Sequence, residues 1–227
     1  MLGILALLAV VPAATVTGTV SATTIPPSIA ASLTHDRHVC GQLGPVWSST
    51  VSADAQKRIA GAIVYLEPRG PTSVKAIQGG GPGRALVIDQ KNCQFVPRVA
   101  AVRAGSEVRV RSSDPVFHNV HIRDLDGATL ANISTPFAGT EVAAFVPKKT
   151  GPLFLGCDAG HQWMKAEILV LDHGFHTRTE RGGTYRLDKV PAGAWWLIAW
   201  HPQLGEVRME IDVRPTDRQL SVPFAFR

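Results

Sequence analysis

A chain of 227 residues, 45% hydrophobic and 18% charged, can hold one large or two small domains and is too apolar to be disordered. Its formal net charge is +5, but the basic residues are scattered, and no Lys/Arg run or nucleic-acid motif is present. This pattern argues against a nucleic-acid partner and leaves an acidic protein surface or an anionic membrane as compatible neighbours.

The N-terminus has features of a secretory signal peptide. Residues 2–11 form a short apolar run, and residues 20–22 (Val-Ser-Ala) have the small side chains that precede a signal-peptidase cut. The positively charged residues that usually precede such a run in a signal peptide are missing here, and an uncleaved N-terminal anchor is the alternative. We predict that residues 1–22 are a signal peptide and that residues 23–57, which are rich in Ser, Thr and Ala, form a flexible lead-in.

From residue 58 the pattern changes to short β-strands separated by Gly and Pro turns. The first of these, residues 61–67, is a mostly apolar run typical of a buried strand, and residues 107–111 alternate in the two-residue period of a half-buried sheet. Further strands are expected at 85–89, 99–102, 118–123, 141–146, 153–155 and 166–171. No segment favours a long helix. The sequence therefore predicts an all-β fold with a β-sandwich over residues 58–172.

Two parts of this predicted sandwich carry potential metal ligands. His118 begins one expected strand, while Cys157 ends another and is followed in the next loop by His161 and Met164. Two imidazoles, one thiolate and a weak axial thioether form the ligand set of copper sites that transfer electrons. Each residue alone is more often an ordinary core or surface residue, but the combination in this order predicts one copper ion per chain.

These segments resemble the cupredoxins, the family of plastocyanin- and amicyanin-like blue copper proteins, over about residues 60–171. The resemblance implies a Greek-key β-sandwich in which His118, Cys157 and His161 bind copper and Met164 is the axial ligand. One departure is that three residues separate Cys157 from His161, where amicyanin has two.

The same resemblance assigns roles to residues around the ligands. Asn119 would tie the His118 segment to the Cys157 loop. The edge of His161, surrounded by Gln162 and Trp163, would face the redox partner. Similar proteins that also carry a second β-module often have His where this chain has Arg98.

Residues 173–227 resemble the second half of a carboxypeptidase regulatory-like module, a small transthyretin-like β-sandwich. The resemblance rests on a Gly-Gly turn at 182–183, a Pro-Ala-Gly turn at 191–193 and an aromatic strand at 195–200. Further strands are expected at 206–213 and 219–226. The module is short, so we expect it either to borrow a strand from the first sandwich or to pack as an extension of it.

The chain has three cysteines, and a thiolate at Cys157 leaves Cys40 and Cys93 as a pair. An oxidising compartment would let them form a disulfide; two free buried thiols are the alternative. His35, His38 and Cys40 could also form a metal cluster, but solvated histidines beside a disulfide cysteine are the better interpretation.

The combined pattern predicts a one-electron carrier of the bacterial cell envelope, periplasmic or exported, with or without a membrane tether, whose partner is a cytochrome, oxidase or dehydrogenase. Copper storage or delivery is the alternative function, but depots usually offer several Met or Cys, and only Met164 and Met209 follow the initiator. A scaffold with a vestigial site is disfavoured because all four ligands are intact. No catalytic motif is visible, so we do not expect an enzyme.

Overall fold

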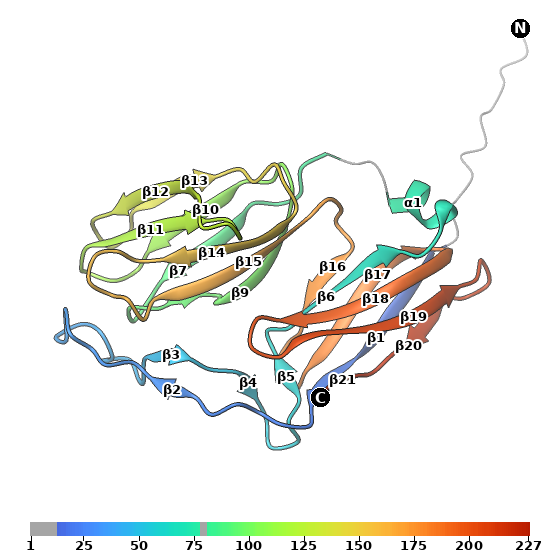
Figure 1. The fold of residues 1–227 in the computed structure, drawn as a ribbon, viewed down its shortest axis with the longest axis horizontal. Helices are drawn as coiled ribbons and strands as arrows, with labels where there is room; N and C mark the ends of the chain where they lie inside the picture. Colours follow the sequence, from blue (N-terminus) through green and yellow to red (C-terminus); the bar gives the residue numbers. More distant parts are fainter. Residues whose placement is uncertain (1–12, 78–80) are drawn as a thin grey trace, which may run out of the picture.

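The computed structural model describes residues 13–77 and 81–227, and its strands form two β-sandwiches that lie next to each other (Figure 1). In these residues the only α-helix is α1 (Pro71–Ile77). No helix in this part of the chain is long and apolar enough to span a membrane. The protein is all-β, as predicted.

The first sandwich packs a five-stranded sheet against a four-stranded sheet. The five-stranded sheet has the order β12 (Thr129–Thr135), β11 (His118–Arg123), β14 (Gly151–Gly156), β15 (Lys165–Leu171), β9 (Val99–Arg103). The other sheet has the order β13 (Glu141–Phe145), β10 (Val108–Ser112), β7 (Leu86–Gln90), β8 (Phe95–Val96). Alternate residues such as Ile88, Val110, Val120 and Ile168 are fully buried between the sheets. The bounds of seven of these strands were predicted to within two residues. The other two, β8 and β12, were not predicted. Strand β8 has only two residues, and the side chains of β12 are mostly exposed and give no apolar signal.

The second sandwich is built from both ends of the chain. One sheet has the order β17 (Thr184–Pro191), β1 (Ala13–Ala22), β20 (Gln219–Ser221), with β21 (Phe224–Phe226) also paired to β1. The facing sheet has the order β16 (His176–Arg178), β6 (Ile63–Pro68), β18 (Gly193–His201), β19 (Gly205–Val213). Its core includes the fully buried side chains of Trp195 and Leu197.

Strand β1 corrects the predicted signal peptide. Residues 13–22 were expected to be removed, but Val16 and Val20 are fully buried and β1 lies between β17 and β20. A cut after Ala22 would take away the central strand of this sheet. The remaining part of the predicted signal peptide, residues 1–12, lies outside the described residues.

Strand β6 corrects the predicted boundary between the domains. It was assigned to the first sandwich, but it pairs with β16 and β18 of the second. Its Val64 and Leu66 enter the second core, while Ile63 and Tyr65 lie in a separate apolar cluster shared with the first sandwich. Burial on both faces produces a continuous apolar run, which predicts a buried strand but does not indicate its partners.

The two sandwiches are joined by that shared cluster. Leu169 and Leu171 of β15 and Val99 of β9 pack there against Ile63, Tyr65 and Ile198 of the second sandwich. Strand β15 turns its other face, with Ile168 and Val170, into the first core. The contact between the sandwiches is therefore an apolar interface between two sheets.

The predicted lead-in is attached to the first sandwich. After β1 the chain leaves the second sandwich, runs along the first through β2 (Ile29–Ala30) and β3 (Trp47–Ser49), and returns through β4 (Ser52–Ala53) and β5 (Ile59–Ala60) (Figure 1). A disulfide between Cys40 and Cys93 joins it to the turn between β7 and β8, which confirms the predicted pairing. We call residues 29–49 the strap.

Candidate metal centre

The three nitrogen and sulfur ligands predicted from the sequence meet at one end of the first sandwich. His118 is the first residue of β11, and Cys157 directly follows Gly156, the last residue of the antiparallel neighbour β14. His161 lies in the loop that leads from Cys157 to β15. The side chains are buried: His118 and His161 are 0% exposed and Cys157 is 4% exposed.

The three ligand atoms form a small triangle. His118 Nδ1 lies 3.1 Å from His161 Nδ1, and Cys157 Sγ lies 3.9 Å from the first and 3.7 Å from the second. A metal ion in a trigonal plane, with the nitrogen and sulfur bond lengths known for zinc, would place the nitrogens about 3.5 Å apart and each about 3.7 Å from the sulfur. The triangle therefore has the size that one metal ion requires.

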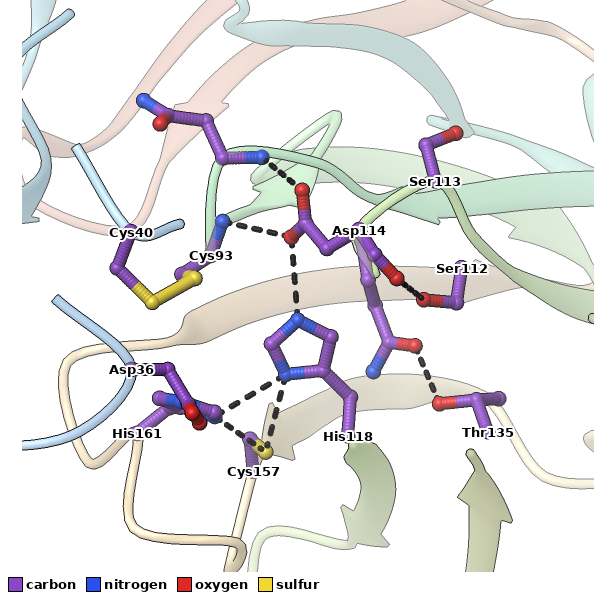
Figure 2. A network of polar contacts seen from close by, with 12 residues as sticks. Asp36, Cys40, Cys93, Ser112, Ser113, Asp114, His118, Thr135, Cys157 and His161 are labelled. Atoms are coloured by element: carbon purple, nitrogen blue, oxygen red, sulfur yellow. Dashed lines mark hydrogen bonds and ion pairs between the residues drawn. A yellow bond between two sulfur atoms is a disulfide. The ribbon is translucent and has the colours of Figure 1, made fainter. Parts of the chain in front are cut away.

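A carboxylate holds the far nitrogen of each imidazole. His118 Nε2 lies 3.1 Å from an oxygen of Asp114, and His161 Nε2 lies 2.9 Å from an oxygen of Asp36 (Figure 2). Because a carboxylate accepts hydrogen bonds, each Nε2 is the donor, and in the neutral rings both Nδ1 lone pairs then point into the triangle. Two lone pairs facing each other at 3.1 Å need a cation or a proton between them, so the donor set fits a bound metal.

Electrostatics within the site favour the thiolate that a metal needs. Burial alone would raise the pKa of the Cys157 thiol, but hydrogen bonds from His118 and His161 lower it to about 6. Burial alone would lower the pKa of His118, but hydrogen bonds to Asp114 and Cys157 raise it to about 9. Without metal, the site therefore holds a thiolate next to an imidazolium.

Asn119 connects the two ligand segments, as the resemblance implied. Its side-chain oxygen accepts a 2.6 Å hydrogen bond from the backbone N–H of Asp158, next to Cys157. Its own backbone oxygen accepts a 3.0 Å hydrogen bond from the buried side chain of Gln90, which in turn accepts a bond from Thr135. These bonds join β7, β11 and β12 to the ligand loop and fix the position of His118.

Asp114 is itself fixed by hydrogen bonds from the backbone. One carboxylate oxygen accepts from the backbone N–H of Asn92 at 2.7 Å, and the other from that of Cys93 at 2.8 Å. Burial alone would raise the pKa of Asp114, but the bonds from His118 and these two amides lower it. Asp114 therefore stays a carboxylate in the core.

Met164 lies in the ligand loop, but its role as axial ligand stays a prediction. Its side chain is buried, and its backbone N–H donates a 2.8 Å hydrogen bond to the carbonyl of His161. Met164 and Cys157 both line a hollow of about 310 Å³ at this end of the sandwich. The left-handed backbone of Gly160, with φ of +87°, provides the bend that the loop needs between Cys157 and His161.

The structure corrects the predicted exposure of the His161 edge. The edge of His161 was expected to face a partner, but Asp36 covers its Nε2 and the side chain is fully buried. Trp163 is also buried; its ring meets that of His161 edge to face at 5.3 Å, and its Nε1 donates to the carbonyl of Cys93.

Sequence reasoning missed both carboxylates. Asp114 lies only four residues before His118, so its position in the sequence could have identified it as a partner of that histidine. Asp36 lies 125 residues before His161 in a Ser/Thr-rich stretch and gave no signal. Arg98, which replaces an expected histidine, donates hydrogen bonds to the carbonyls of Trp47 and Ser48 and so holds the strap.

No protein-family model matches the sequence, and no curated protein matches it significantly. Among solved structures, it is similar to the purple cupredoxin of Nitrosopumilus maritimus (20% identity, 39% of this chain and 100% of that chain covered, TM-score 0.32). It is also similar to a mutant of amicyanin in its reduced state (16% identity, 48% and 98% covered, TM-score 0.34). A third is the Cu-containing nitrite reductase of Thermus scotoductus (19% identity, 46% covered, TM-score 0.33), and the chain spans only 27% of its length.

Proposed function

We propose that this protein is a copper-binding electron-transfer protein with a single mononuclear type 1 site, held by His118, Cys157, His161 and Met164. The observation that carries the proposal is the buried triangle of two Nδ1 atoms and one thiolate sulfur at 3.1, 3.7 and 3.9 Å. Thiolate and imidazole together accept both oxidation states of copper. Bound copper would supply a one-electron Cu(II)/Cu(I) couple.

The protein's own contribution is a rigid cage. His118 stands on a β-strand, Cys157 directly follows one, and both are surrounded by the packed first core. Ligands positioned by packed strands and by hydrogen bonds to Asn119 and the two carboxylates resist rearrangement when the charge changes. Little rearrangement favours fast electron transfer, whereas a depot must open to release its metal.

The disulfide supports a location in an oxidising compartment. Structural disulfides persist in exported proteins and are rare in the cytosol of most organisms. We therefore propose that the protein works in the bacterial cell envelope, free or tethered, and exchanges electrons with a cytochrome, an oxidase or a dehydrogenase. We propose no enzymatic reaction for it.

The decisive experiment is copper loading followed by visible and electron-spin-resonance spectroscopy. We expect one copper ion per chain and a strong visible band from thiolate-to-copper charge transfer, which Cys157→Ser abolishes. His118→Gln should also lose the band, whereas His121→Gln, three positions along the same strand, should keep it. A wild-type protein that binds copper without colour would refute the ligand assignment.

Copper storage or delivery is separated from electron transfer by a second measurement. A carrier should give one reversible voltammetric wave over many cycles and should retain Cu(I) when a Cu(I) chelator is added. Loss of copper to the chelator within minutes of reduction would favour delivery.

A further inference from the structure

The strap contacts the metal-ligand loop at two consecutive residues. Asp36 binds His161 Nε2 at 2.9 Å, and the ring of His35 lies on Gly160 so closely that a Cβ atom there would be 2.8 Å from His35 Cγ. Asp36 itself adopts a left-handed backbone with φ of 49°. The strap therefore covers the side of the loop that carries His161.

The strap is fastened beside these contacts. The Cys40–Cys93 disulfide is one attachment, and the side chain of Asn92 is another: it accepts from the Gly41 N–H at 2.9 Å and donates to the Gly44 carbonyl at 3.1 Å. The backbone amides of Asn92 and Cys93 also support Asp114. The same turn thus anchors the strap on one side and Asp114, the carboxylate partner of His118, on the other (Figure 2).

The two histidines thereby receive equivalent partners from unrelated places. Asp114 belongs to the first sandwich, whereas Asp36 reaches His161 only because the strap is in place. A carboxylate on the outer nitrogen of a ligand histidine fixes the ring orientation and makes the ligand more basic. Its negative charge also favours the more highly charged state of a bound metal.

We propose that Asp36 is a positioning residue of the metal centre, and that the strap which carries it closes the His161 edge to solvent and redox partners. The copper-dependent part of this inference rests on the proposed function. Electrons would then enter and leave by a surface other than the one at His161.

The cover is tested in metal-free protein, without any assumption about copper. Carbethoxylation by diethyl pyrocarbonate, quantified at each histidine by peptide mass spectrometry, measures access to the rings. We expect His161 to react at least about tenfold faster in Asp36→Ala and in the Cys40→Ser/Cys93→Ser double variant, as loss of a hydrogen bond to a charged group predicts. In Asp36→Ala, His118, equally buried but held by Asp114, is the internal control and should not change.

The positioning role is tested by the reduction potential of copper-loaded protein. Asp36→Asn keeps an acceptor oxygen but removes the charge, so His161 in the metal-free protein should react more slowly than in Asp36→Ala, and the potential of the copper-loaded protein should rise. The exposed Asp126→Asn, in the turn at the far end of β11, should change neither.

Two results would overturn the proposal. One is a wild-type His161 that reacts as fast as the exposed His38; the other is an Asp36→Ala protein, folded by circular dichroism, with unchanged His161 reactivity and an unchanged spectrum. Wild-type protein that fails to bind copper would refute the proposed function instead, and the carbethoxylation results would still decide whether the strap is a cover.

Discussion

The two sandwiches use the same architecture for different purposes. The second has a core of aliphatic and aromatic side chains closed by a strand from the N-terminal end of the chain. In the first sandwich, hydrogen-bonded polar side chains are buried at one end of the core. They include Gln90, Asp114, His118, Thr135 and His161. Buried polar groups are tolerated only when each has a partner, so this end is built from hydrogen bonds and a disulfide where the second sandwich uses packing.

The disulfide, which fastens the strap to the first sandwich, should make the largest contribution. It links cysteines 53 residues apart, a loop for which chain-entropy arguments give about 4 kcal/mol. We therefore expect Cys40→Ser/Cys93→Ser to lower the free energy of unfolding of the metal-free protein by about that amount. Urea denaturation measures it, with oxidised wild-type protein as the reference. An unchanged midpoint would show that the strap is held by its hydrogen bonds alone.

Packing should dominate in the second sandwich. Leu197 is fully buried at the centre of β18, so Leu197→Ala should cost about 3 kcal/mol through lost burial and the cavity left behind. The visible band of copper-loaded protein should not move, because β18 contributes nothing to the metal site. Met209→Ala, at the paired and exposed position on β19, is the matched control. A shifted band in Leu197→Ala would mean that the two sandwiches are coupled.

A smaller change at the polar end of the first sandwich should act on metal binding. Asp114→Asn keeps one acceptor for the amides of Asn92 and Cys93 but weakens the hold on His118. Loss of such an outer carboxylate typically lowers metal affinity by about 10–100-fold. Competition with a chelator of known affinity measures this, and Asp126→Asn controls for the lost charge. Equal affinities in the two variants would contradict the role assigned to Asp114.

The smallest effect should be a loss of stability in acid that comes from the second sandwich. Burial lowers the pKa of His201 to about 4, and the charge of Arg178 adds to this. The unfolded chain, with a histidine pKa of about 6.5, binds the proton first, so stability is complete above about pH 6.5 and falls as the pH drops toward 4. At about pH 5.5 we expect a loss of about 1 kcal/mol that His201→Gln removes and His38→Gln does not. Parallel pH profiles for wild type and His201→Gln would exclude this explanation.

The sequence was informative wherever the signal is local. Strand β10 was predicted within one residue of its observed bounds, because the alternation at 107–111 reflects the exposure of each residue to water. The proposed ligand set was visible for the same reason: His118 stands at a strand end, and Cys157, His161 and Met164 lie close together in one loop. The count of cysteines left Cys40 and Cys93 as the candidate pair once Cys157 was assigned, and the structure decided between a disulfide and two free thiols.

Only the tertiary structure decided which segments belong together. β1 pairs with β20 and β21, which lie about 200 residues later in the chain, and Asp36 meets His161 across 125 residues. An apolar run such as β6 shows that both of its faces are buried, but not by which sheet. Asp36 lies in a polar stretch, and nothing in the sequence around it indicates that it contacts His161. Long-range contacts depend on how whole sheets pack, and the local pattern of residues does not encode that choice.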